Sequence, residues 1–202
     1  HRRRPPTARA TEHARAISRY HALEKQIARA SDSDKDALLA EQQALGGLEV
    51  YQNQSTTGGA VLRGGESSKW CAKILMELWP FSRRIHLLDV GAIAGTAYAK
   101  WKHKFDVTSI DIQPRAPHVL QADFFDFPMP AREEERFDVI GLSLVINFVG
   151  DLAKRGDMLL HAHRYLRRGG YVYVVLPLPC LTNSRYMTHD HFARLVRATG
   201  YD

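Results

Sequence analysis

Four apolar segments in the second half of the chain constrain the fold more than any other feature. They are HLLDV (86–90), FDVTSID (105–111), FDVIGLSLV (137–145) and YVYVVLP (171–177). Helical patterns are expected between or after them, at about 96–103, 152–168 and 189–199. Continuous apolar strands that alternate with helices are typical of a parallel sheet with helices on both faces. The sequence therefore predicts an α/β domain over residues 81–202, with a further short strand before QADFFDF (121–127).

The first 80 residues have a helical pattern instead. A first helix is expected over about residues 7–30, where apolar side chains recur at helical spacing: Ile17, Tyr20, Leu23 and Ile27. A second helix, begun by the capping oxygens of residues 31–34, is expected to be interrupted near residue 46 and to end near Gln54. A Gly/Ser-rich connector (55–68) and a third helix, SKWCAKILMELW (68–79), complete this amino-terminal region of residues 1–80.

The positive charge of the chain is concentrated at its start. Residues 1–30 hold eight Lys or Arg against two Glu, which accounts for the whole net charge of +6. A basic arm on an otherwise neutral body is typical of a polyanion partner, because each neutralised phosphate releases condensed counterions. A solvated helix face or a targeting tail is the alternative.

The composition of the chain and its two ends limit the kinds of protein that it can be. No apolar run approaches the ~20 residues of a membrane span, and no signal-peptide pattern is present, so we expect an intracellular protein without a membrane partner. Two distant cysteines, Cys71 and Cys180, predict neither a disulfide framework nor a zinc cluster, and two His-X-His pairs lack accompanying ligands, so no metal is expected. The chain starts at His1 and stops just after the last expected helix, so we expect it to be cut at its carboxyl end.

The loop in LLDVGAIAGT (87–96) has the form of a nucleotide-binding turn with one departure. Gly91 and Gly95 let the backbone turn sharply, whereas Ile93 stands where G-x-G-x-x-G has its middle glycine. That glycine lets the backbone close on a pyrophosphate. S-adenosylmethionine has no phosphate, so a loop with Ile93 can still hold it, whereas a nicotinamide dinucleotide fits less well. For the two glycines alone, a tight structural turn is the alternative.

Acidic residues follow the next two strands, at the edge where open α/β sheets bind ligands. Asp111 ends the second strand twenty residues after Gly91, where an acid reaches the hydroxyls of a ribose. Asp123 can accept a hydrogen bond from an adenine amino group while the ring of Phe124 packs on the base. These residues predict an adenosine site and, with the loop, S-adenosylmethionine as the cofactor.

Two segments carry a resemblance to a known family. SLVINFV (143–149) and LPLPCLTNSRY (176–186), with RGGESSKW (63–70) before the sheet, resemble the fungal family that methylates N1 of an adenine in 25S ribosomal RNA. The resemblance covers most of residues 48–202 and implies a Rossmann-like class I methyltransferase sheet. It also implies S-adenosylmethionine as cofactor, ribosomal RNA or a preribosomal particle as partner, a role in ribosome biogenesis, and a nuclear, nucleolar location.

The resemblance assigns roles at the cofactor site. It places Gly91 in the methionine-side loop, Asp111 at the ribose, Asp123 and Phe124 at the adenine, and Ser143 at the floor of the pocket. Arg63 is a candidate partner of the methionine carboxylate, which a guanidinium can grip through two hydrogen bonds, or else an arginine of a solvated loop.

The resemblance also points to a target-base site. Asn147 follows the fourth strand, where its carboxamide offers a donor and an acceptor to a base edge; capping of the next helix is the alternative. Further contacts to the base are expected from Pro177, Leu178, Pro179, Asn183, Arg185 and Tyr186. A rigid exit from the strand is the alternative for the prolines. Because N1 of adenine is unprotonated at neutral pH, an rRNA (adenine-N1)-methyltransferase needs no catalytic base, and positioning supplies the rate.

Two rival functions remain open at the level of sequence. A sensor would keep the S-adenosylmethionine pocket and regulate a protein partner without methylating RNA. It needs neither Asn147 nor a basic arm, so these features favour the enzyme. The other rival is a nicotinamide-dependent dehydrogenase, which the missing middle glycine disfavours.

Overall fold

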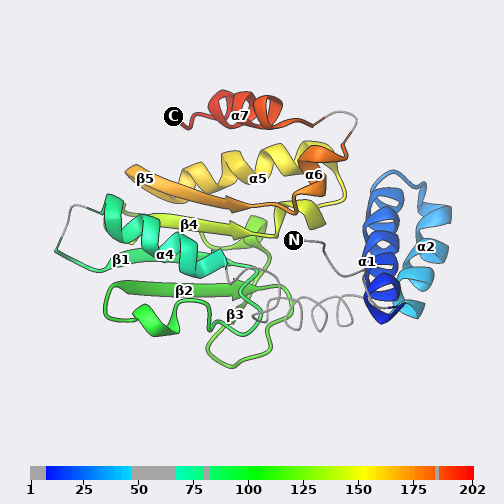
Figure 1. The fold of residues 1–202 in the computed structure, drawn as a ribbon, viewed down its shortest axis with the longest axis horizontal. Coiled ribbons are helices and arrows are strands. Elements are labelled where there is room, and N and C mark those ends of the chain that lie inside the picture. The colour runs from blue at the N-terminus through cyan, green and yellow to red at the C-terminus, as the bar shows by residue number, and fades with distance from the viewer. Residues whose placement is uncertain (1–7, 47–66, 80–81, 185–186) are drawn as a thin grey trace, which may run out of the picture. The chain divides into compact units, whose positions relative to one another are not determined.

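The computed structural model describes residues 8–46, 67–79, 82–184 and 187–202 (Figure 1). The chain divides into two compact units. The first comprises His1–Gly64 with Phe148–Asp151, and the second comprises Gly65–Asn147 with Leu152–Asp202. The third helix, which the sequence pattern groups with the amino-terminal region, thus belongs to the unit that holds the sheet.

The second unit is built on a five-stranded parallel sheet in the order β3-β2-β1-β4-β5 (Figure 1). Its strands are β1 (Ile85–Val90), β2 (Phe105–Asp111), β3 (Leu120–Gln121), β4 (Phe137–Ser143) and β5 (Leu166–Val175). After β1 the chain adds β2 and β3 on one side, and it then crosses back to add β4 and β5 on the other side of β1. The predicted parallel sheet is confirmed, and the reversal marks the edge at which such sheets bind ligands.

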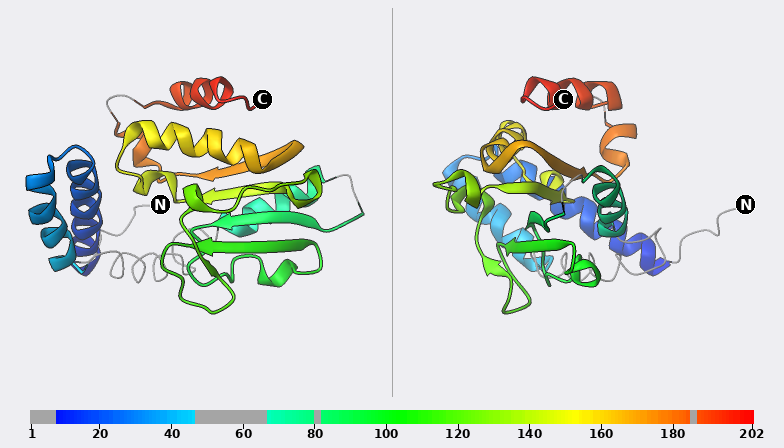
Figure 2. Two further views of the ribbon diagram at one scale, coloured as in Figure 1. Left: turned by 180° about the vertical axis from the view of Figure 1, so that it is seen from behind. Right: turned by 90° about the vertical axis from the view of Figure 1, so that its left-hand side faces the viewer.

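Helices α4 (Ser67–Leu78) and α5 (Leu152–Tyr165) lie on opposite faces of this sheet (Figure 2). Cys71, Ala72 and Leu75 of α4 form a stripe at helical spacing that packs on Leu87 and Val139 of the central strands. The other helix buries Met158, Leu159, Ala162 and Tyr165. Burial of apolar surface on both faces explains why the strands read as continuous apolar runs.

The predicted boundary between α5 and β5 is wrong by several residues. The helix ends at Tyr165 rather than near 168, and β5 starts at Leu166, five residues before YVYVVLP. Gly169 has a φ of +76°, and a Cβ on Gly170 would lie 2.8 Å from the carbonyl oxygen of Asp138. The two glycines therefore let the chain pass close to β4, so that β5 begins before them. In the sequence alone, Arg-Arg-Gly-Gly is typical of the end of a helix, which explains the wrong boundary.

The helix predicted over about 96–103 is also wrong. Only a single 3₁₀ turn, η2 (Ala99–Trp101), forms there. Tyr98 is buried, with its ring 5.5 Å from that of Phe105, and Trp101 is partly buried against the same core. Side chains three residues apart lie on one side of a 3₁₀ turn, so this geometry seats both rings.

After β5 the chain forms α6 (Pro179–Thr182) and α7 (His189–Ala198). The helix predicted at 189–199 is confirmed, and the hydroxyl of Thr188 caps it by accepting a hydrogen bond from the backbone N–H of His191 at 3.1 Å. None of the helices in the described ranges is long and apolar enough to cross a bilayer.

The first unit contains a helical hairpin of α1 (Ala8–Ile27) and α2 (Asp32–Ala44). Both predicted helices are present, and the predicted continuation of the second to Gln54 lies outside the described residues. Tyr20 and Leu23 are buried, and the Tyr20 ring lies 6.4 Å from that of Phe148. Arg19 of α1 forms an ion pair with Glu41 of α2, with 2.9 Å from its Nε to the carboxylate. Ser31 is the N-cap residue before α2, yet its hydroxyl makes no capping bond and donates to Asp34 instead.

Candidate cofactor and target-base site

The loop after β1 has a left-handed backbone at three positions: Gly91 (φ +72°), Ile93 (φ +52°) and Gly95 (φ +62°). For a β-branched residue this conformation is uncommon and costs about 1 to 3 kcal/mol. Two hydrogen bonds hold Ile93 in it: its N–H donates to Oδ2 of Asp111 at 2.9 Å, and its carbonyl accepts from the N–H of Arg115 at 2.8 Å. Ile93 thus adopts the backbone that a glycine usually supplies.

The two glycines of this loop are required by close contacts. A Cβ on Gly91 would lie 2.8 Å from a methyl of Val145, in the turn after β4, and one on Gly95 would lie 2.7 Å from a methyl of Val119. Contacts this short do not occur for real Cβ atoms. The loop is therefore packed against the segments that follow β4 and β2.

Asp111, predicted at the ribose, is buried at the end of β2 and organises the loop. Besides Ile93, it accepts a hydrogen bond on Oδ1 from the backbone N–H of Gln113, at 2.8 Å. The ribose contact stays a prediction, and positioning of Ile93 is a second role that sequence spacing does not indicate.

Asp89, on the neighbouring strand β1, is a residue that the sequence analysis did not single out. It is 6% exposed, and its carboxylate forms no hydrogen bond with any part of the chain that the structure describes. Burial, and then the charge of Asp111, raise the pKa of Asp89 to about 7. An acid inside an apolar strand is costly to bury, and that was the available signal in HLLDV.

The floor of the site is formed by the ends of β4 and α4. Ser143 lies at the last position of β4, and its Oγ is 2.9 Å from Oγ of Ser67, the first residue of α4. Tyr173 of β5 donates a hydrogen bond to the carbonyl of Ser67 at 2.7 Å. These bonds fix the amino terminus of α4 at the carboxyl ends of the strands. The buried hydroxyl of Ser68 has no partner in the described residues.

The predicted adenine residues follow β3. Asp123 caps a 3₁₀ turn, η3 (Phe124–Asp126), by accepting a hydrogen bond from the N–H of Phe125 at 2.9 Å. The Phe124 ring is only 3% exposed, because it packs on α5 beside His161 and Tyr165, with centroids 4.9 and 5.4 Å away. Their contacts with a base stay predictions, and the packing of Phe124 leaves little of its ring free for stacking.

Asn147 lies in a 3₁₀ turn, η5 (Ile146–Phe148), directly after β4, and is 8% exposed. Its Oδ1 is buried and has no hydrogen-bond partner among the described residues, which include the start of α5, so the alternative that it caps α5 is wrong. Its backbone carbonyl accepts from Arg155 of α5 at 3.4 Å. An orphaned amide oxygen costs about 1 to 3 kcal/mol, and a donor on a bound base would remove that cost.

The remaining predicted contacts to the target base lie in the segment after β5, and the structure describes only some of these residues. Pro177 accepts a backbone hydrogen bond from Cys180 at 2.8 Å, and Pro179 is the first residue of α6, so LPLP leads into a helical turn rather than continuing straight. Asn183 is exposed at the end of α6 and accepts from the Thr182 hydroxyl at 3.3 Å. Three predicted residues lie outside the described ones: Arg63, Arg185 and Tyr186.

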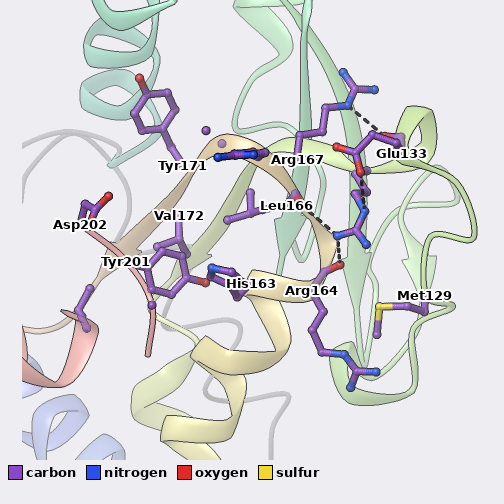
Figure 3. A pocket seen from close by; sticks show the side chains of 16 residues that line it. Met129, Glu133, His163, Arg164, Leu166, Arg167, Tyr171, Val172, Tyr201 and Asp202 are labelled. Atoms are coloured by element: carbon purple, nitrogen blue, oxygen red, sulfur yellow. Dashed lines mark hydrogen bonds and ion pairs between the residues drawn. The ribbon is translucent and has the colours of Figure 1, made fainter. Parts of the chain in front are cut away.

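A separate cavity of about 930 Å³ lies at the opposite end of β5 (Figure 3). Four arginines are among the residues that line it: Arg136, Arg164, Arg167 and Arg168. Arg167 bonds to the carboxylate of Asp138 and to the carbonyls of Glu133 and Glu134, and Arg136 pairs with Glu133 at 3.0 Å. Half of this positive charge is therefore used inside the protein, and the cavity is remote from the predicted site residues at the carboxyl ends of the strands.

Comparison of the chain with known proteins gives a family match. Residues 36–202 match the family described as 25S rRNA (adenine(2142)-N(1))-methyltransferase, Bmt2. The protein of that name from Saccharomyces cerevisiae is 33% identical over 157 residues, which cover 77% of this chain and 46% of the yeast protein. The 25S rRNA adenine-N(1) methyltransferase of Schizosaccharomyces pombe is 34% identical over 152 residues, 70% of this chain and 55% of that protein. The chain thus spans about half the length of these relatives.

Solved structures agree with the fold. The 1,6-didemethyltoxoflavin-N1-methyltransferase of Burkholderia thailandensis, solved with S-adenosylhomocysteine, has a TM-score of 0.55 and 18% identity over 84% of this chain and 79% of that one. The plantazolicin methyltransferase BpumL, also in complex with S-adenosylhomocysteine, has a TM-score of 0.55 and 17% identity over 93% and 77%. The predicted Rossmann-like methyltransferase fold, with a helical amino-terminal region before it, is confirmed.

Proposed function

We propose that this chain, which belongs to the 25S rRNA (adenine(2142)-N(1))-methyltransferase family, Bmt2, transfers a methyl group from S-adenosylmethionine to N1 of an adenine in 25S ribosomal RNA. The observation that carries the proposal is the family match over residues 36–202. That range contains the loop after β1, the acids that follow the strands, and Asn147.

The residues at the carboxyl ends of the strands fit S-adenosylmethionine. The carboxylate of Asp111 suits the ribose hydroxyls, Asp123 suits the adenine amino group, and the Gly91 loop with Ser143 suits the methionine end. The unpartnered carboxyl of Asp89 suits a ligand that carries positive charge. When bound, the cofactor supplies an electrophilic methyl group on a sulfonium.

The target base would be held from the side of Asn147. Its unpaired Oδ1 can accept from the amino group of an adenine, which orients the neighbouring N1. N1 is unprotonated at neutral pH, so the protein needs to align the base rather than remove a proton, and alignment alone can supply several kcal/mol. Because N1 lies on the pairing edge, the adenine must be unpaired and turned out of its stack. Pro177 and Asn183 are proposed to contact it.

The basic helix α1 is proposed to bind the RNA backbone. Arg15 and Lys25 are exposed on it and Arg29 is exposed in the turn that follows it, while Arg19 is paired with Glu41. A large, folded substrate such as ribosomal RNA or a preribosomal particle offers phosphates far from the target base. With this substrate, a nuclear and nucleolar location is proposed, where ribosomes are assembled.

The test is methyl transfer by the full-length protein. 25S rRNA lacking the modification would be incubated with the protein and methyl-labelled S-adenosylmethionine, digested, and separated into nucleosides for mass spectrometry. Labelled N1-methyladenosine at one position is expected, and it should depend on the protein. Binding of the cofactor without any labelled nucleoside, on free RNA and on preribosomal particles, would overturn the proposal in favour of a sensor.

A further inference from the structure

We infer that Trp70, on the first turn of α4, is a stacking platform for an unpaired base of the RNA substrate, next to the target adenine. The inference rests on the proposed function, which supplies the RNA, and it adds a base-binding residue to the site. Trp70 is the last residue of RGGESSKW (63–70), one of the segments that carry the resemblance to the family.

The indole ring of Trp70 is largely open to solvent. Trp70 is 60% exposed, whereas Trp79 and Trp101 are partly buried against the core. Single exposed apolar side chains are common on protein surfaces, so exposure alone does not indicate a ligand. Trp70 differs from such side chains because its ring is held in place.

Tyr173 of β5 holds this ring. The rings of Trp70 and Tyr173 stack, with their centroids 5.8 Å apart and their planes 30° from parallel. The hydroxyl of Tyr173 also donates a hydrogen bond to the carbonyl of Ser67 at 2.7 Å, so the same tyrosine is bonded to the turn that carries Trp70. Tyr173 covers one face of the indole, and the other face is open to a planar ligand. A ring that is already ordered loses little conformational entropy when it binds.

The ring lies at the edge of the sheet where the strands end. Oγ of Ser67 is 2.9 Å from Oγ of Ser143, the last residue of β4, and Trp70 follows Ser67 by a rise of ~4.5 Å along the helix. Side chains of a helix lean toward its amino terminus, so the indole leans toward the Ser67 end of α4. Asn147 follows Ser143 in the turn after β4. Trp70 and Asn147 are therefore both close to the end of β4, where the target base is proposed to bind.

Two lysines lie beside the ring on the outer side of α4. Lys69 precedes Trp70, Lys73 lies about one turn after Lys69, and both are exposed. An aromatic ring with cations beside it is typical of sites that bind single-stranded nucleic acid, because the ring stacks on a base while the cations contact phosphates. The positive charge favours RNA over an apolar protein surface as the occupant.

The reaction itself creates a need for such a platform. Turning the target adenine out of its stack leaves the neighbouring base without a stacking partner on that side. The open face of Trp70 can replace the lost partner, since every base has a π face. Trp70 thereby holds the strand next to the adenine while Asn147 orients the adenine itself.

The experiment measures binding and methylation of a 25S rRNA stem-loop that contains the target adenine, with the full-length protein. Trp70→Ala should weaken binding of this RNA by about 5- to 100-fold, the factor that corresponds to the loss of one base stacked on an aromatic ring. Trp70→Phe should keep most of the affinity. Stacking releases no counterions, so the slope of log affinity against log salt should not change in Trp70→Ala, whereas Lys73→Gln should lower it by ~0.7 to 0.9. The affinity for S-adenosylmethionine should be that of the wild type in all three variants.

A matched control and three outcomes keep the test decisive. Tyr171→Ala is the control and should bind the RNA like the wild type, because Tyr171 is the other exposed aromatic side chain of the described residues and lines the separate cavity. Wild-type RNA affinity in Trp70→Ala, or an equal loss in Tyr171→Ala, overturns the inference. Normal binding of free RNA by Trp70→Ala with loss of methylation only on preribosomal particles also overturns it, in favour of a protein partner. A wild-type protein that neither binds nor methylates RNA instead contradicts the proposed function. Melting curves establish that each variant is folded.

Discussion

The carboxylate of Asp111 accepts a hydrogen bond from the backbone N–H of Ile93, with 2.9 Å between the two atoms. This bond joins the end of β2 to the loop after β1 and stabilises the left-handed conformation of Ile93. One side chain therefore shapes the loop proposed for the methionine end and is also the proposed partner of the ribose. The two ends of the proposed cofactor site are coupled through it.

This coupling predicts that Asp111→Ala loses affinity for S-adenosylmethionine by roughly ten- to a hundredfold, since an unpaired hydroxyl and a released loop each cost about 1 kcal/mol or more. Calorimetry on the folded variant measures the loss. Asp106→Ala is the matched control, because Asp106 lies on the same strand at its other end, exposed and 3.6 Å from Arg84. Equal affinities for the two variants would remove Asp111 from the cofactor site.

A second prediction concerns the unpaired amide of Asn147. Asn147→Ala removes a buried oxygen that has no partner in the part of the chain that the structure describes, so the free energy of unfolding should stay the same or rise by up to about 1 kcal/mol. Methyl transfer in a single turnover should fall by one to several orders of magnitude, because misplacing a reactant by about 1 Å can cost ~100-fold. Cofactor affinity should be kept. A variant that still methylates at the wild-type rate would end the assignment of Asn147 to the target base.

The apolar pattern was sufficient to predict the sheet, because only a parallel sheet buries such strands on both faces. It was insufficient where distant residues decide the outcome. The packing of Phe124 depends on His161 and Tyr165, which come more than thirty residues later and reach it only once α5 covers the sheet. The start of β5 likewise depends on how closely Gly170 approaches β4.

Asp89 shows the same limit at the candidate site. In the sequence it is one acid at the end of an apolar run, and its position resembles that of Asp111. Their difference arises from partners: Asp111 accepts two backbone N–H groups, whereas Asp89 accepts none in the described structure. Such partners depend on loop conformation, which the spacing of residue types does not specify.

A third prediction is that the free protein is less stable at neutral than at acidic pH because of Asp89. Its folded pKa, about 7, lies above the unfolded value near 4, so the contribution of Asp89 is complete below pH 4 and is lost as the pH rises to 7. Asp89→Asn should therefore be more stable than the wild type at pH 7.5 by about 1 to 3 kcal/mol, since one pKa unit corresponds to ~1.4 kcal/mol and the buried amide retains some cost. Urea unfolding at pH 5 and pH 7.5 measures the difference, which should shrink at pH 5. If the free energy of unfolding of Asp89→Asn differed from that of the wild type by the same amount at both pH values, the raised pKa of Asp89 would be contradicted.

The exposed basic side chains of α1 and the turn after it provide a fourth prediction. Replacing Arg15, Lys25 and Arg29 with Gln should weaken RNA binding and lower the slope of log affinity against log salt by up to about 3, since each lost phosphate contact removes ~0.7 to 0.9. Cofactor affinity should not change. Removing three exposed lysines elsewhere, Lys100, Lys102 and Lys104, is the control for net charge alone. If both triple variants lower the slope equally, α1 is not a specific RNA contact.

The last prediction uses the room beside Asp89. Gly141→Ala adds a methyl group that meets its nearest neighbours at 3.6 to 3.9 Å, so the free protein should fold and melt like the wild type. If the methionine end of the cofactor enters this space, the added methyl excludes it, and affinity for S-adenosylmethionine should fall by at least tenfold. Gly91→Ala is the contrasting variant, because there a Cβ would meet Val145 at 2.8 Å on a backbone of φ +72°, so it should lower the melting temperature as well as the affinity. Wild-type affinity in Gly141→Ala would place the methionine end elsewhere along the sheet edge, and would separate Asp89 from the ligand.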